Sequence, residues 1–452
     1  MSKITLRQAA AWCGGRVEPQ YEDVAFLGAG NDTRKIQPGQ LFVALEGVRD
    51  GHDFIDAAFE KGAAAVLCKH CRGAYPALIV EDPRIALGQI AAGMRQAMGM
   101  KVVGVTGSVG KSTTKEMIAA VLQGSYIVSK TPANFNNDLG MPMSILAMPE
   151  DTQVAVLEMG MNHFGEIRYL TNIAKPDVAV IINVGTMHVE NLGSRQGILQ
   201  AKLEILEGVS RQGVVCLNGD NDMLQSCDPG RPVTWFGTGA HCAVRGEHVR
   251  EGEAGLSFDV VAGEETFSVT LPLEGLHYVS DALAAVAVGL SLGVPPQQIR
   301  LRLANFQNMA GRQEIFTAKE CTIIQDCYNA GPESMAAALA VLGKRNGRRI
   351  AVLGDMLELG DHAHDSHLRV GTLAAEHADL ILAYGPHAAL VVQGAEEAGN
   401  PNAIAFHDRK EMADTLKELT VPGDTLLFKG SHGMHMELVL QQFLTEETNR
   451  EE

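Results

Sequence analysis

The chain has 452 residues, of which 46% are hydrophobic, and a formal net charge of −17. A chain of this length folds into roughly two to four domains of about 150 residues each. The negative charge disfavours nucleic acids and anionic membranes as partners, because both repel an acidic surface. The sequence shows no membrane span of about 20 apolar residues and no signal-peptide core, so we expect a cytoplasmic protein. Eight scattered cysteines are typical of reduced thiols.

Residues 1–98 are predicted to form a small α/β domain. A short helix is expected near the N-terminus, then a charged turn at residues 32–35, a strand over residues 41–45 and a helix from Phe54 to Lys61. The charged turn, Glu46-Gly47 and His52 all fall in loops around that strand. Together they indicate a pocket for an anionic ligand, and a solvated surface turn is the alternative.

Residues 102–113 predict a phosphate-binding loop. A β-branched run ends in Gly107-Ser108-Val109-Gly110-Lys111-Ser112-Thr113, and the following residues have helical apolar spacing. Backbone N–H groups at a helix N-terminus cradle phosphates, while the lysine neutralises charge and the serine hydroxyl suits Mg²⁺. The first glycine of the longer pattern is replaced by Val105, so the match is to the shorter form. The segment therefore predicts a nucleoside triphosphate site.

Residues 99–310 carry this loop in a domain that alternates strands with helices. A strand over residues 154–157 ends at Glu158, and a strand over residues 177–185 is followed by His188. Because ligands gather beyond the carboxyl ends of parallel strands, both side chains are expected beside the loop as Mg²⁺ ligands. The amide-rich segment 134–140 is either a solvated turn or a loop facing the ligand.

Residues 311–452 predict a second doubly wound domain. Apolar runs at residues 322–325, 349–353, 380–384 and 425–428 are typical of parallel strands between helices. A cluster of aspartates and histidines from Asp361 to His367 follows a Glu-Leu-Gly turn. Its position favours the polar start of a helix over a metal site.

Over essentially its whole length, the chain resembles the Mur ligase family. The resemblance implies an α/β fold with a small N-terminal α/β domain, a central P-loop ATPase-like domain with a parallel sheet and a Rossmann-like C-terminal domain. In the family's adenine segment, two asparagines are replaced here by Tyr278 and Asp281. The matching segments are residues 32–35, 38–39, 41–47, 51–54, 106–112, 134–142, 158–167, 188–194, 201–205, 311–312, 326–329, 354–360 and 429–431.

The resemblance assigns roles residue by residue. The uridine diphosphate end of a substrate would contact Asp32, Thr33, Arg34, Glu46, Gly47 and His52, and the incoming amine would face Lys429 and Ser431. ATP would contact Gly107, Ser108, Val109, Gly110, Lys111, Ser112, Thr113, Asn137, Arg312, Asp326 and Asn329. Mg²⁺ would be held by Ser112, Glu158, His188 and Lys202, the last as a carbamate. The catalytic residues would be Lys111, Glu158, His188 and Lys202.

The activity implied by the resemblance is ATP-dependent joining of D-alanyl-D-alanine to UDP-N-acetylmuramoyl-tripeptide through an acyl phosphate. This would be a step of bacterial peptidoglycan synthesis, carried out by a monomer in the cytoplasm. Residues 134–142 and 158–167 favour this activity over the neighbouring ligase that adds the third amino acid. That ligase is one alternative, and a nucleotide-binding switch that ligates nothing is another.

Overall fold

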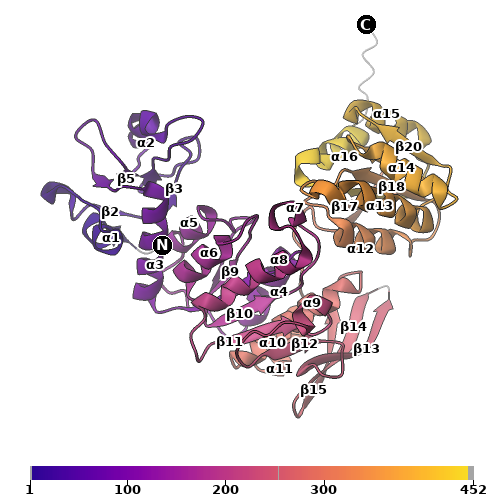
Figure 1. Ribbon diagram of the computed structural model, residues 1–452, viewed down its shortest axis with the longest axis horizontal. Coiled ribbons are helices and arrows are strands. Elements are labelled where there is room, and N and C mark those ends of the chain that lie inside the picture. Colours follow the sequence, from indigo (N-terminus) through magenta and orange to yellow (C-terminus); the bar gives the residue numbers. More distant parts are fainter. Residues whose placement is uncertain (1–2, 253, 446–452) are drawn as a thin grey trace, which may run out of the picture.

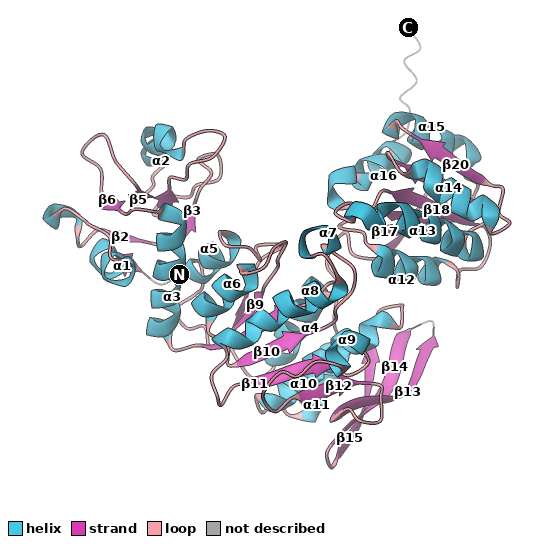
Figure 2. Cartoon of the chain, viewed as in Figure 1, coloured by secondary structure: helices cyan, strands magenta, loops and turns pink. Residues whose placement is uncertain are grey.

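The computed structural model describes residues 3–252 and 254–445, which form three domains in chain order (Figure 1). Each domain is built on its own parallel or mixed sheet, with helices packed against it (Figure 2). This is the three-domain α/β architecture expected from the sequence. Among the described helices, none is long and apolar enough to cross a membrane.

The N-terminal domain contains a parallel sheet in the order β3-β4-β5-β6 and an antiparallel β1–β2 pair. Helix α3 begins at Asp82, whose carboxylate accepts the N–H groups of Arg84 and Ile85, and ends at Gly99, which is left-handed. Its apolar face belongs to a core shared with the central domain. The elements are β1 (Ile4–Thr5), α1 (Leu6–Cys13), η1 (Pro19–Tyr21), β2 (Ala25–Phe26), β3 (Ala29–Gly30), β4 (Leu41–Val43), η2 (Gly51–Phe54), α2 (Ile55–Glu60), β5 (Ala65–Cys68), β6 (Ala77–Ile79) and α3 (Pro83–Met98).

The central domain has a mixed sheet in the order β15-β14-β13-β12-β11-β10-β7-β9-β8. The strands from β8 to β13 pair in parallel, and β13, β14 and β15 form antiparallel hairpins. Strand β7 lies between β9 and β10, so the loops that follow these three strands lie side by side. The strands are β7 (Lys101–Thr106), β8 (Val128–Lys130), β9 (Val154–Glu158), β10 (Val178–Ile181), β11 (Val214–Asn218), β12 (Thr234–Gly237), β13 (Val244–Gly252), β14 (Gly255–Ala262) and β15 (Glu265–Leu271).

Helices cover both faces of this central sheet. Apolar side chains of α4 and α10 pack on one face, whereas α3, α5, α6 and α8 contribute to the core on the other. The pairing of α4 with α10 is fixed by a hydrogen bond of 2.8 Å from Thr114 to Asp281. The helical elements are α4 (Lys111–Leu122), α5 (Gly140–Leu146), α6 (Glu166–Ala174), α7 (Val189–Leu192), α8 (Arg195–Leu203), η3 (Glu204–Gly208), α9 (Asp222–Gln225), α10 (His277–Ser291) and α11 (Pro296–Ala304).

The C-terminal domain has a sheet in the order β16-β17-β21-β18-β19-β20, in which all neighbours except β16 and β17 are parallel. The four strands predicted here are confirmed as β17, β18, β19 and β21. The elements are β16 (Glu314–Ala318), β17 (Cys321–Asp326), α12 (Pro332–Leu342), β18 (Arg349–Gly354), η4 (Gly360–His362), α13 (Ala363–His377), β19 (Leu380–Tyr384), α14 (Ala388–Glu397), β20 (Ala403–Phe406), α15 (Arg409–Leu419), β21 (Thr425–Lys429), η5 (His432–Met434) and α16 (Met436–Leu444).

Two predicted strands were too long. The strand expected over residues 177–185 is β10, Val178–Ile181, because the backbone from Ile182 onwards turns away to contact the phosphate loop. The strand expected over residues 41–45 ends at Val43. The helix predicted after His52 begins with a 3₁₀ turn, η2, and the cluster after Gly360 starts α13 as predicted.

Candidate active site

A cavity of about 460 Å³ lies between the central and C-terminal domains. Its walls include residues 108–113 and Glu158 from the central domain, and Arg312, Asp326 and Lys429 from the chain beyond it. In Figure 1, helix α7 of the central domain lies next to the C-terminal domain. The cavity is therefore built by two domains, and neither one closes it alone.

The loop after β7 has the geometry of a phosphate-binding turn. Gly110 is left-handed, with φ 84°, and a Cβ there would lie 2.8 Å from Oδ1 of Asp281, so this position requires glycine. The ammonium of Lys111 turns back to the carbonyl oxygens of Gly107 and Ser108, at 2.9 and 3.2 Å. Burial lowers the pKa of Lys111, and Glu158 opposes this shift. A cation beside the N-terminus of α4 suits a polyphosphate.

The loop after β10 supports the phosphate loop. Oδ1 of Asn183 accepts the N–H groups of Ser108 and Val109, both at 2.9 Å, and its Nδ2 donates to the carbonyl of Val109 at 2.9 Å. The N–H of Gly185 donates to Oγ of Ser108 at 2.9 Å. Ser108, predicted as a nucleotide contact, therefore also joins the two loops.

Glu158 ends β9 inside the cavity, and one of its carboxylate oxygens accepts no hydrogen bond from the described residues. The residue is 1% exposed, and its Oε1 accepts a hydrogen bond of 2.8 Å from Nδ2 of Asn136. Its Oε2 is buried and has no hydrogen-bond partner among the described residues. The ammonium of Lys115 lies 3.7 Å from Oε2 but donates to the carbonyl of Thr131. A buried carboxylate oxygen without a donor fits a bound cation.

His188 and Ser112 line the same cavity. Nδ1 of His188 lies 2.8 Å from Oε2 of Glu358, a residue of the C-terminal domain. The hydroxyl of Ser112 accepts a hydrogen bond of 3.0 Å from Arg312. The structure thus brings together three of the four predicted Mg²⁺ ligands, and the carboxylate and hydroxyl oxygens among them are donors that this ion prefers.

Lys202, the fourth predicted ligand, is buried in α8 with 1% exposure. It makes no hydrogen bond or ion pair with another residue in the described part of the chain, and it is not among the residues lining the cavity. Burial lowers the pKa of Lys202 well below its ordinary value, and the charge of Lys111 lowers it further. The environment therefore favours the neutral amine.

The C-terminal wall presents a chain of polar contacts. Nζ of Lys429 donates to Oδ2 of Asp326 at 2.6 Å and to the carbonyl of Asn329 at 3.0 Å, and all three residues line the cavity. The guanidinium of Arg312 lies 3.9 Å from the ring centroid of Tyr328. Ser431 lies behind this wall, where its hydroxyl donates to the carbonyl of Ala330 at 3.2 Å and accepts the N–H of Leu357 at 2.9 Å.

The substrate residues predicted in the N-terminal domain do not line this cavity. Asp32 pairs with Arg34 at 2.8 Å, and Glu46 pairs with Lys69. Within the described residues, no hydrogen bond or ion pair joins the Asp32–Arg34 pair to Glu46 or His52. The predicted anion pocket therefore consists of two loops whose charged residues pair separately. Thr33 lies in the loop of Asp32 and Arg34, and Gly47 lies in the loop of Glu46.

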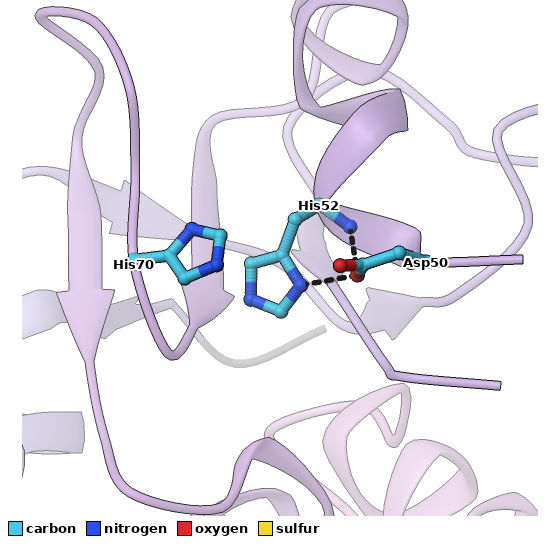
Figure 3. A group of neighbouring side chains, drawn as sticks. All are labelled: Asp50, His52 and His70. Atoms are coloured by element: carbon cyan, nitrogen blue, oxygen red, sulfur yellow. Dashed lines mark hydrogen bonds and ion pairs between the residues drawn. The ribbon is translucent and has the colours of Figure 1, made fainter.

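His52 connects two loops of that domain (Figure 3). Its Nδ1 lies 2.6 Å from Oδ1 of Asp50, and its Nε2 accepts the backbone N–H of Lys69 at 3.1 Å. The ring of His70 lies alongside, with centroids 4.3 Å apart. Asp50, His52 and His70 are close enough to suggest a metal site, but both nitrogens of His52 are already engaged. His52 therefore connects the loops that carry Asp50 and Lys69.

Comparison with known proteins decides the family. Three family models match the chain: the Mur ligase family catalytic domain at residues 25–95, the Mur ligase middle domain at residues 105–289, and the Mur ligase glutamate ligase domain at residues 311–432. The UDP-N-acetylmuramoyl-tripeptide–D-alanyl-D-alanine ligase of Bacillus subtilis is 40% identical over 98% of this chain and 99% of its own length. The chain belongs to the Mur ligase family.

Solved structures of Mur ligases share the fold of the whole chain. A crystal structure of MurF from Acinetobacter baumannii matches with a TM-score of 0.91 and 32% identity, covering 99% of this chain and 100% of that one. MurF from Thermotoga maritima in complex with ADP matches with a TM-score of 0.81 and 30% identity, covering 92% of this chain and 97% of that one. The family and the three-domain architecture expected from the sequence are therefore confirmed.

Several polar residues of this Mur ligase cavity were not predicted from the sequence. Asn183 and Glu333 contact the loops that carry Ser108 and Thr186, and Asn136 contacts Glu158. Glu358, which lies beside His188 but does not line the cavity, belongs to segment 354–360, which resembles the family. Asn136 lies in the amide-rich segment that could have been a ligand-facing loop, and here that segment does line the cavity through Asn134, Asn136 and Asn137. Glu333 carried no local signal, because its partner Thr186 is in another domain.

Proposed function

We propose that this Mur ligase joins D-alanyl-D-alanine to UDP-N-acetylmuramoyl-tripeptide with ATP as the energy source. The observation that carries the proposal is a cavity in which three features meet: a phosphate loop, a buried carboxylate with one oxygen that accepts no hydrogen bond from the described residues, and a lysine–aspartate pair from a second domain. The name of the 40% identical relative supports the choice of substrates. The ADP in a related MurF structure supports the choice of nucleotide.

The first step would transfer a phosphoryl group. A carboxylate oxygen of the tripeptide attacks the γ-phosphorus of ATP, the bond to the bridging oxygen breaks, and ADP leaves an acyl phosphate behind. Such a transfer depends mainly on positioning and on neutralising charge. Lys111 and Arg312 each place a cation beside the phosphate loop, and backbone N–H groups at the start of α4 add to them.

The second step would form the amide. The amine of D-alanyl-D-alanine attacks the acyl carbon, the carbon–oxygen bond to phosphate breaks, and the amine loses a proton. Lys429 and Ser431 at the end of β21 are the residues we assign to the incoming dipeptide. Asp326 and Asn329 on the same wall would hold ATP, together with Asn137. Water must be kept from the acyl phosphate, which the enclosing domains can do.

Mg²⁺, when bound, would supply positive charge against the phosphates, held by Ser112, Glu158, His188 and Lys202. An ammonium would repel the cation, so Lys202 has to change its charge. The neutral amine that burial favours can attack CO₂, forming an N–C bond and releasing a proton, which gives an anionic carbamate. The buried position of Lys202, without a carboxylate partner in the described structure, supports this modification.

The N-terminal domain would hold the uridine diphosphate end of the substrate through Asp32, Thr33, Arg34, Glu46, Gly47 and His52. The match of this domain to a Mur ligase family model supports that role. We further propose that the enzyme acts as a monomer in the cytoplasm, where a nucleotide-linked precursor and ATP are both available.

The test is phosphate release from ATP by the purified chain with UDP-N-acetylmuramoyl-tripeptide, measured with and without D-alanyl-D-alanine. The tripeptide should be supplied with either lysine or diaminopimelate as its third residue. Release that requires both the tripeptide and the dipeptide would support the proposal. Release with a UDP-linked dipeptide and a free amino acid would instead indicate the ligase that adds the third residue, and release with ATP alone an uncoupled ATPase.

A further inference from the structure

The loop at residues 182–188 is held by the C-terminal domain through Glu333. Oε1 of Glu333 accepts the backbone N–H of Thr186 at 2.8 Å and its hydroxyl at 3.0 Å. A Cβ at Gly185 would lie 2.7 Å from the same oxygen, so the glycine allows the carboxylate to approach. A Cβ at Gly331 would likewise lie 2.2 Å from Sδ of Met187. The loop and the start of α12 are therefore in tight contact.

A second carboxylate of the C-terminal domain reaches the same loop. Oε2 of Glu358 lies 2.8 Å from Nδ1 of His188. Both residues have left-handed backbones, with φ 66° at His188 and φ 63° at Glu358. This conformation is costly for residues other than glycine and persists where the surroundings hold it. The contact therefore joins two residues that both have the uncommon left-handed backbone conformation.

The other end of the loop holds the phosphate loop. Asn183 bonds to Ser108 and Val109, and Gly185 bonds to Ser108, as described above. Residues 183–188 thus connect two partners. The phosphate loop lies on one side, and the carboxylates of Glu333 and Glu358 lie on the other.

We propose that Glu333 and Glu358 are positioning residues that set His188 for metal binding only while the C-terminal domain lies against the central domain. The inference rests on the proposed function, because it takes His188 as a Mg²⁺ ligand. When the C-terminal domain approaches, the two carboxylates would hold His188 in place at the metal site. The same loop would contact the phosphate loop through Asn183.

The chemical reason concerns the two nitrogens of the imidazole. A carboxylate beside Nδ1 favours the tautomer in which Nδ1 carries the proton and Nε2 carries the lone pair. Outer partners of this kind change metal affinity by about 10–100-fold when they are removed. Glu333 acts on His188 indirectly, because it holds the backbone of Thr186, two residues before the histidine.

The experiment measures binding of Mn²⁺ to the full chain with ADP, following free Mn²⁺ by electron paramagnetic resonance. Glu358→Ala should weaken Mn²⁺ binding about tenfold, and Glu358→Gln should weaken it less, because its amide oxygen can replace the carboxylate oxygen beside Nδ1. Glu333→Ala should weaken binding and speed hydrogen exchange at the Thr186 amide. Asp361→Asn, an exposed change three residues from Glu358, is the matched control and should leave binding unchanged.

His188→Ala is the reference for loss of the ligand itself, and thermal unfolding checks that each variant is folded. The proposal would be overturned by one pattern of results. In it, Glu358→Ala and Glu333→Ala bind Mn²⁺ as tightly as the unchanged chain, whereas His188→Ala binds it more weakly. If His188→Ala binds Mn²⁺ normally, His188 is not a ligand and the proposal also fails. The ligase reaction is judged separately, by the phosphate-release measurement, so the two failures can be told apart.

Discussion

Arg312, just beyond the central domain, donates a hydrogen bond of 3.0 Å to the hydroxyl of Ser112, the residue that follows the phosphate-loop lysine. Its guanidinium also lies over the ring of Tyr328, 3.9 Å from the centroid. A planar cation whose face is stacked on a ring keeps the N–H groups along its edge available for a phosphate.

Two replacements of Arg312 should therefore distinguish the contribution of its positive charge from that of its planar shape. Arg312→Ala should lower kcat by about 100-fold, as expected when one donor to a developing charge is lost. Arg312→Lys should recover only part of that loss, since an ammonium neither stacks nor forms a fork. Steady-state phosphate release measures both variants. Full activity in the lysine variant would show that only the charge at this position is needed.

Lys111→Ala should abolish turnover and leave the fold intact. The ammonium is the cation that the phosphate loop places beside the nucleotide, and we expect kcat to fall by at least about 100-fold. Phosphate release and thermal unfolding measure the two parts of this prediction. Lys101→Ala, at the exposed start of β7, is the control and should behave like the unchanged chain. Near-normal ligation by Lys111→Ala would contradict the assignment of the loop.

Lys202→Ala should lose activity by at least about tenfold and regain part of it with a short carboxylic acid. A small carboxylate such as acetate can occupy the space left by the side chain and supply the missing anion. Activity measured against acetate concentration tests the rescue. A ¹³C carbamate signal from the unchanged chain in labelled bicarbonate tests the modification directly. A Lys202→Ala enzyme with full activity would remove the carbamate from the mechanism.

Asp281 should make stability depend on pH. Burial raises its pKa from 3.8 to about 7, although Thr114 and Arg312 oppose the shift. Between these two values the folded chain holds a proton that the unfolded chain has lost, so the free energy of unfolding falls as pH rises and levels off above about 7.

Asp281→Asn should remove that slope, because the amide keeps an acceptor for Thr114 and cannot ionise. Its stabilisation relative to the unchanged chain should grow from pH 5 to pH 8 by at most about 3 kcal/mol. Thermal unfolding of both chains across this range gives the comparison. A gap that is constant with pH would mean that Asp281 is ionised throughout.

His52→Ala should destabilise the N-terminal domain by about 1–3 kcal/mol, since the N–H of Lys69 loses its acceptor and the carboxylate of Asp50 loses a partner. Hydrogen exchange at residues 44–53 and 65–71 would measure local opening without assuming that three domains unfold together. His70→Ala, the neighbouring exposed histidine, is the matched control. Equal protection in both variants would mean that His52 does not connect these loops.

The sequence was informative where structure follows from neighbouring residues. The phosphate loop depends on glycines and a lysine within one turn, and Glu158 follows its strand directly, so both could be placed before the fold was known. The parallel sheet then brought His188 to the same edge. The amide cluster was located, but which amide meets Glu158 depends on the path of the loop.

Contacts between domains could not be predicted in this way. Thr186 and Glu333 are 147 positions apart, and their contact depends on how two domains lie against each other. No periodicity or motif encodes that placement. The antiparallel hairpins of β13, β14 and β15 were also missed, although the alternation of buried and exposed residues along them is typical of strands with one exposed face. The role of Lys202 came from the resemblance alone.

The two-domain construction of the cavity sets a limit on how quickly ligands exchange. Lys111 and Lys429 lie on the walls contributed by the central and the C-terminal domain, so a molecule that contacts both residues bridges the two domains. Its release requires that the domains separate while all of its contacts on one wall break together. An inhibitor that spans both walls should consequently have a long residence time, whereas one confined to the phosphate loop should leave rapidly even at equal affinity per contact.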